Sequence, residues 1–144
     1  MSGFAFTVRE ADWQTDAQSL RAIRHEVFIV EQNVPAELEF TGDDDQHHHV
    51  IAINAQGDPI GTARLSAAGK IGRMAVLKNA RRKGVGSAML NMLIAIAKIH
   101  GHRAVTLSSQ LHALPFYKSF GFVESGETFI EAGIDHIKML RPVT

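Results

Sequence analysis

Residues 79–90 read NARRKGVGSAML and place three consecutive cations and a Gly-x-Gly directly before an apolar run. This composition predicts a turn that leads from a strand into a helix. Such a turn leaves backbone N–H groups unpaired at the positive end of the helix dipole, where an anion binds well. Gly84 and Gly86 would let the backbone approach that anion closely. We therefore expect a phosphate-binding turn, with a plain strand-to-helix connection carrying solvated cations as the alternative.

Short β-rich runs precede this turn, and a further strand and helix follow it. VIAINA, PIGTARLS and KIGRMAVL, within residues 50–77, are separated by the turn-like QGD and AAG and predict a three-stranded meander. Residues 84–100 are apolar on most sides and predict a helix packed on a sheet, with Gly101 as its stop. RAVTLSS then predicts a strand, LHALPFYKSF a short helix, and residues 121–142 a terminal hairpin around EAG.

The amino-terminal part of the chain predicts one strand and one long helix. FAFTVRE alternates as a strand does, and Thr15 with Gln18 resembles a capping box that opens a helix running to about Gln32. A meander followed by strand, helix and strand implies an α/β fold, with a mixed sheet and helices on both of its faces.

Composition limits the functions that such a chain can have. We expect a single domain spanning residues 1–144, in which Lys+Arg 15 balance Asp+Glu 15. This neutrality argues against nucleic acid and against an anionic membrane as partners. The chain contains no cysteine, which excludes a cysteine nucleophile and a thiolate metal site. Its amino terminus lacks a signal-peptide pattern and its longest apolar stretch is interrupted by polar residues, so we expect a cytoplasmic protein.

Two named phosphate motifs do not fit the turn, but a third does. Position 89 is Met rather than the last glycine of a dinucleotide fingerprint, and the spacing of a P-loop is missing. RRKGVG fits the Q/R-x-x-G-x-G/A acyl-CoA loop of the GNAT superfamily of N-acetyltransferases, and VTLSSQLHALPFYKSFGF resembles that family's later strand and tyrosine-bearing helix. RHEVFIVEQNVPAELEF, residues 24–40, resembles the ElaA-like and YjcF-like subgroup. The resemblance thus covers nearly the whole chain.

The resemblance implies the fold, the co-substrate and the reaction. It implies a GNAT acyl-CoA N-acyltransferase fold, a mixed sheet of about six to seven strands flanked by about four helices. It also implies direct transfer, in a ternary complex, of the acetyl group of acetyl-CoA to a primary amine of a small molecule such as an amino sugar, a polyamine or an amino acid. By resemblance, the acetyl and pantetheine parts would contact the backbone of Met74, Ala75 and Val76, and the pyrophosphate would contact Arg81, Arg82, Lys83, Gly84, Val85, Gly86 and Ser87.

Three side chains are candidates for the chemistry. Tyr117, the only tyrosine, matches the family's position for a general acid that protonates the departing thiolate, and plain core packing is the alternative. Glu31 is the candidate general base, because the apolar segment around it would raise its pKa; an exposed helix-end carboxylate is the alternative. Arg73 lies among apolar residues, and we expect it to pair with Glu31 or to bind an anionic part of the acceptor.

The segment DDDQHHH, residues 43–49, invites a metal site, but nothing in it fixes a ligand geometry, and we expect no metal. We expect its acidic residues to line the acceptor entrance and attract a cationic amine, with His49 reaching the cleft; a solvated loop is the alternative. Two further functions stay open, an acyl-CoA-binding module or sensor without turnover and a protein N-acetyltransferase. The edge of the terminal hairpin could also pair with a second chain and give a homodimer.

Overall fold

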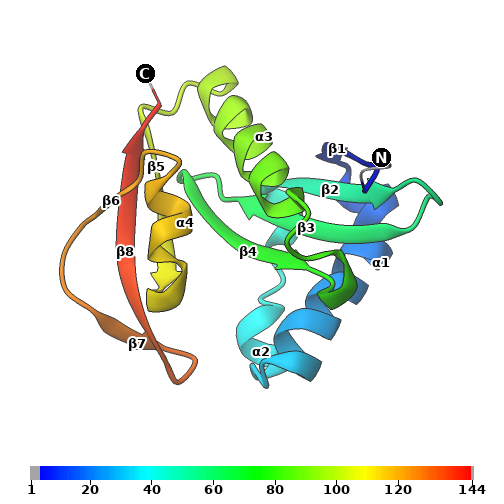
Figure 1. Ribbon diagram of the computed structural model, residues 1–144, viewed down its shortest axis with the longest axis horizontal. Coiled ribbons are helices and arrows are strands. Elements are labelled where there is room, and N and C mark those ends of the chain that lie inside the picture. Colours follow the sequence, from blue (N-terminus) through cyan, green and yellow to red (C-terminus); the bar gives the residue numbers. More distant parts are fainter. Residues whose placement is uncertain (1–3, 144) are drawn as a thin grey trace.

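The computed structural model of the chain describes residues 4–143 and contains one sheet of eight strands (Figure 1). The strands are β1 (Phe6–Ala11), β2 (His48–Asn54), β3 (Pro59–Leu65), β4 (Lys70–Val76), β5 (Ala104–Gln110), β6 (Val123–Glu124), β7 (Phe129–Glu131) and β8 (Ile134–Pro142). The α-helices are α1 (Trp13–Arg24), α2 (Ala36–Glu39), α3 (Val85–Ile99) and α4 (Leu114–Lys118). A π-helical segment, His25–Glu31, continues α1, and short 3-10 turns occupy Asp44–Gln46, Lys78–Ala80 and Leu111–Ala113.

The sheet is mixed, as expected, and its strand order shows where it opens. The order is β1–β2–β3–β4–β5–β8–β6, with β7 also paired to β8. The predicted meander is confirmed as the antiparallel β2–β3–β4. By contrast, β4 and β5 are parallel and pair only at Lys70 with Thr106 and at Ile71 with Leu107. Beyond these two pairs the strands separate, which frees the edge of β4 that would otherwise face β5.

The expected mixed sheet flanked by about four helices is confirmed, with four α-helices and slightly more strands than expected. The surplus lies in the terminal region, where β6 and β7 are only 2 and 3 residues long and both pair with β8. The predicted hairpin turn around EAG separates β7 from β8, and its Ala132 and Gly133 have positive φ angles of 51° and 76°.

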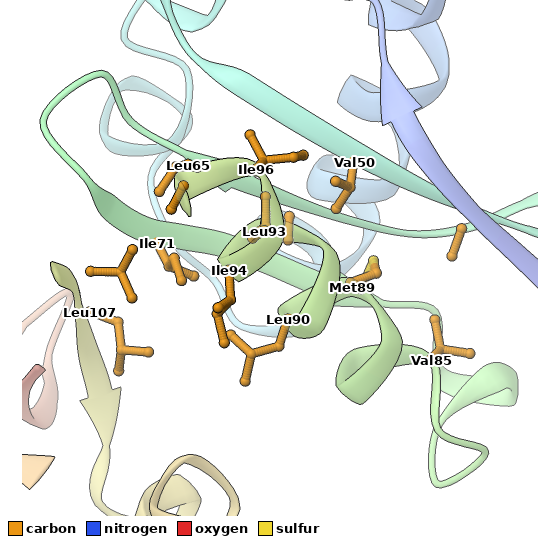
Figure 2. Close-up of a cluster of buried hydrophobic side chains, with 14 of the residues drawn as sticks. Val50, Leu65, Ile71, Val85, Met89, Leu90, Leu93, Ile94, Ile96 and Leu107 are labelled. Carbon is orange, nitrogen blue, oxygen red and sulfur yellow. The ribbon is translucent and has the colours of Figure 1, made fainter. Parts of the chain in front are cut away.

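Two helices bury opposite faces of the meander. Figure 2 shows α3 lying on the face that carries Val50, with its Met89 and Leu93 directed toward the strands. Side chains alternate along β2, so His49 points to the other face, where it stacks on Trp13 at the start of α1. The predicted arrangement of helices on both faces is therefore confirmed.

The close approach of α3 to β3 depends on Gly61. A Cβ at this position would lie 3.2 Å from both Val85 Cγ1 and Met89 Cε, and 3.2 Å from the Ala75 carbonyl oxygen. Because no larger residue fits there without displacing its neighbours, Gly61 allows the first turn of α3 to lie against the sheet. Gly61 is paired with Val76, so the amino end of α3 sits beside the end of β4.

The first helix begins earlier than predicted. Its N-cap is Asp12, whose side chain accepts a hydrogen bond from the backbone N–H two residues later at 2.8 Å, so Thr15 lies inside the helix. Asp12 is the better cap because Asp16 in turn accepts from the Asp12 N–H at 2.9 Å, which closes the helix end from both sides. From His25 to Glu31 the helix is π-helical, and it ends next to the predicted Gln32.

Candidate active site

A cavity of about 510 Å³ opens where β4 and β5 separate. Its walls come from the π-helical segment and α2 on one side, from β4 and β5 at the base, and from α4 and the β7–β8 hairpin on the other side. This volume suits a small molecule. The lining side chains that bear on its chemistry are Phe28, Glu39, Arg73, Met74, Tyr117 and His136.

A second cavity, of about 280 Å³, lies at the predicted anion-binding turn. The two cavities are lined by residues that are close in sequence on β4 and on α4. Phe116 lines the second cavity and Tyr117 the first, while Met74 lines the first and Val76 the second. One elongated ligand lying along β4 and α4 would therefore reach both cavities. The remaining lining residues of the second cavity are Ala80, Arg81, Arg82, Gly84, Val85, Gly86 and Ser87.

The turn at residues 82–87 presents a row of backbone donors. Arg82 and Gly84 have positive φ angles of 62° and 86°, and α3 begins after Gly84 with no side chain capping it. Within the described residues 4–143, no oxygen accepts a hydrogen bond from the N–H groups of residues 82–87. Such a run of unpaired donors at the start of a 15-residue helix can hold an anion.

Arg81 is held between the end of β4 and the π-helical segment. Its Nε donates to the Val76 carbonyl at 2.8 Å, and its two terminal nitrogens each donate to one carboxylate oxygen of Glu31 at 2.6 Å. These hydrogen bonds lower the pKa of Glu31, so the expectation of a raised pKa is wrong. Glu31 is also absent from the lining of the larger cavity, and its position does not support the predicted role as general base.

Tyr117 lines the larger cavity and packs edge-on against two aromatic rings. Its ring centroid lies 5.1 Å from that of Phe116 and 6.0 Å from that of Phe122. Burial raises the pKa of Tyr117, because a phenolate would be poorly solvated there. Tyr117 therefore keeps its proton at neutral pH and can give it to an anion that forms beside it.

A buried ion network supports one wall of the larger cavity. Arg24 is 0% exposed and donates to Glu39 Oε1 at 3.2 Å and to Asp44 Oδ1 at 2.8 Å. Arg64 donates to the same Asp44 oxygen at 3.1 Å. The network fixes α1, α2 and β3 relative to one another, and it holds the carboxylate of Glu39 at the cavity wall.

Arg73 extends this ion network to the wall of the larger cavity. It sits at a bulge of β4 with a φ of 52°, and its Nε lies 3.1 Å from Glu39 Oε2. The predicted pair of Arg73 with Glu31 is therefore wrong, because Arg81 already holds Glu31. The Arg73 side chain is 27% exposed, so part of its guanidinium remains accessible from the cavity.

Residues 43–49 line neither cavity, which corrects the predicted acceptor entrance. His49 is 1% exposed, stacks on Trp13 with ring centroids 4.7 Å apart, and donates from Nε2 to the Asp44 carbonyl at 2.8 Å. Burial lowers the pKa of His49. The segment turns inward because the Asp44 carboxylate binds Arg24. The prediction that His49 reaches the cleft is therefore wrong.

Glu39 and His136 also line the larger cavity, and neither was predicted from the sequence as a site residue. Glu39 stands between apolar residues in AELEF, which could have indicated burial, but its partners are distant in sequence. His136 is 7% exposed in β8, and its inward position in a strand is the sequence feature that could have indicated it.

Within residues 4–143, no three histidine or acidic side chains group as metal ligands. No helix among these residues has the length and apolar character to cross a bilayer.

A family model described as "Acetyltransferase (GNAT) domain" matches residues 12–141. A Bacillus subtilis protein, described as an uncharacterized N-acetyltransferase YjcF, is 37% identical over 123 residues, which cover 83% of this chain and 87% of YjcF. The protein ElaA of Escherichia coli is 31% identical over 134 residues, which cover 87% of this chain and 86% of ElaA.

Solved structures share the arrangement of these elements. The crystal structure of Escherichia coli ElaA matches with a TM-score of 0.82 at 26% identity and covers 94% of this chain and 99% of that one. An acyl-CoA N-acyltransferase from Pseudomonas aeruginosa matches with a TM-score of 0.82 at 31% identity and covers 96% of this chain and 99% of that one.

Proposed function

This chain belongs to the GNAT family of acetyltransferases, and from this premise we propose that it transfers the acetyl group of acetyl-CoA to a primary amine of a small molecule. The observation that carries the proposal is the pair of cavities lined by neighbouring residues of β4 and α4. One has the row of free backbone donors that a pyrophosphate requires, and the other has a half-buried tyrosine beside a space of small-molecule size.

The cavities suggest how acetyl-CoA would lie. Its pyrophosphate would bind the N–H groups of residues 82–87, and its pantetheine arm would follow the free edge of β4 from Val76 to Met74. Ala75 would contribute only its backbone, because its side chain packs on the opposite face against Ile23 and Val27. Lys83 does not line the cavity and would act through its charge at longer range. The thioester would then lie in the larger cavity beside Tyr117.

The chemistry follows from this placement. An uncharged amine attacks the thioester carbonyl, and backbone donors of β4 stabilise the oxyanion that forms. The C–N bond forms, the C–S bond breaks, and Tyr117 donates its proton to the departing thiolate. A covalent acetyl-enzyme is not required, since the chain has no cysteine to form one.

The proposal is tested by measuring free-thiol release from acetyl-CoA with a panel of amino sugars, polyamines and amino acids. The protein has no thiol of its own, so every thiol detected comes from coenzyme A. We expect release that depends on the amine. If acetyl-CoA binds and no amine in the panel or in a set of lysine-containing peptides promotes release, the chain acts as a binding module and the proposed activity is wrong.

Glu31→Gln is expected to strengthen binding of acetyl-CoA by about twofold to fivefold. In the wild type, the carboxylate of Glu31 accepts a hydrogen bond from each terminal nitrogen of Arg81 and adds negative charge beside the proposed pyrophosphate site. The pair is about one-third exposed, and such pairs contribute only ~0–1 kcal/mol, so its loss would free Arg81 at small cost. Calorimetric titration with acetyl-CoA measures the change.

Glu26→Gln is the matched control for Glu31→Gln, because Glu26 is exposed on the same π-helical segment. Its affinity should equal that of the wild type. Weaker binding by Glu31→Gln would show instead that Glu31 holds Arg81 in the position that the phosphates need.

A further inference from the structure

His136 lies where β8 meets the end of β5, on the hairpin side of the larger cavity. Its backbone pairs with Gln110, the last residue of β5, and its ring stacks on that of Phe129 with centroids 5.9 Å apart. Only 9% of its side chain is exposed. Strand pairing on both sides and the stacked ring therefore fix the imidazole at the cavity wall.

The hydrogen bond of Nδ1 determines which nitrogen of His136 carries the proton. Nδ1 lies 2.7 Å from the Ile134 carbonyl oxygen, and a carbonyl only accepts hydrogen bonds. Nδ1 must therefore carry the hydrogen, and in the neutral ring Nε2 has the free lone pair. Nε2 has no hydrogen-bond partner among residues 4–143, and it is not sealed from solvent.

Glu131 places an anion beside this ring. Its Oε2 lies 3.9 Å from His136 Nε2, which is within ion-pair distance and longer than a hydrogen bond. The hairpin thus supplies both a base and an anion that compensates its charge. The other titratable groups around the same cavity are Glu39, Lys70, Arg73, His112 and Tyr117.

From this geometry we propose that His136 is the general base that takes the proton from the ammonium group of the acceptor. This inference rests on the proposed acetyl transfer. Glu39 is less suited, because its two oxygens face Arg24 and Arg73. Glu31 lines neither cavity, and Arg81 holds both of its oxygens.

The proton balance is complete with groups that line the cavity. The acceptor enters as an ammonium ion and gives one proton to His136 Nε2, which leaves the nitrogen lone pair free to attack the thioester carbon. When the C–S bond breaks, Tyr117 protonates the thiolate and recovers a proton from the new amide nitrogen. His136 releases its proton to water, so each turnover yields one acetylated amine, one coenzyme A and one proton.

His136→Gln is the direct test, with the panel amine that gives the fastest thiol release as probe. We expect kcat/KM to fall about 100-fold or more. The inflection in the pH profile of kcat/KM that a histidine base causes should disappear, and kcat/KM should instead keep rising with pH until the acceptor amine itself is deprotonated, while the affinity for acetyl-CoA stays unchanged. His100→Gln is the matched control, because His100 caps the far end of α3 and lines neither cavity.

His136→Ala separates a catalytic from a structural role. Added imidazole should restore part of its rate, as a base entering the vacated space would, and the thermal unfolding midpoint is measured to identify a misfolded variant. If His136→Gln folds and keeps the wild-type rate and pH profile, or if His112→Gln loses this inflection instead, the inference is wrong. Absence of amine-dependent release in the wild type would defeat the proposed function itself, which distinguishes the two failures.

Discussion

Tyr117→Phe should lower kcat by about 10²- to 10⁴-fold, the range typical of general acid–base assistance. The change removes only the hydroxyl, so the edge-on contacts of the ring with Phe116 and Phe122 remain. Because burial raises the pKa of Tyr117, the phenol is protonated and can serve as a proton donor throughout the neutral range. Initial rates of thiol release at saturating acetyl-CoA measure the loss.

The affinity for acetyl-CoA distinguishes a proton donor from a packing residue. Tyr117→Phe should bind acetyl-CoA as tightly as the wild type, since the proposed pyrophosphate contacts lie in the other cavity. Phe122→Leu is the control, because it disturbs packing against the Tyr117 ring and retains the hydroxyl. A Tyr117→Phe variant with the wild-type kcat would remove Tyr117 from the mechanism.

Arg24→Met is expected to cost about 3–5 kcal/mol of the free energy of unfolding, which is a large part of the ~5–15 kcal/mol typical of a domain. The substitution leaves Glu39 and Asp44 buried, at 3% and 4% exposure, without their shared cation. Urea denaturation measures the change. Adding Asp44→Asn to Arg24→Met should recover part of the loss, because one buried carboxylate that keeps only Arg64 as its partner is then removed.

Arg21→Met is the matched control for Arg24→Met. Arg21 lies one turn earlier on α1, is exposed, and makes a cation–π contact with Trp13 at 5.1 Å. Its replacement should cost less than about 1 kcal/mol. An Arg24→Met variant as stable as Arg21→Met would show that the buried network does not stabilise the fold.

Local sequence patterns predicted the parts of the fold that depend on local chemistry. The short β-rich runs and the turn residues between them in residues 50–77 predicted the meander, and the glycines after three cations predicted the turn into α3. Apolar residues on most sides of residues 84–100 predicted a helix buried on the sheet. In each case the signal lies within a few residues of the element that it predicts.

The errors arose where a partner comes from a distant part of the chain. Glu31 stands in an apolar segment, yet its environment is set by Arg81. The acidic segment 43–49 was predicted to line the acceptor entrance, with a solvated loop as the alternative, yet Asp44 binds Arg24 and Arg64 inside the protein. The same limit explains why His136 was missed, because only the pairing of β8 with β5 brings it to the cavity.

The central claim is direct transfer of an acetyl group to an amine, and one reaction tests it most directly. The wild-type protein is incubated with acetyl-CoA and the most active amine, and the coenzyme A and acetylated amine formed are quantified together by mass spectrometry. We predict equal amounts of the two products and no acetylated protein intermediate. Coenzyme A formed without acetylated amine, or no product of either kind with any amine tested, would contradict the account.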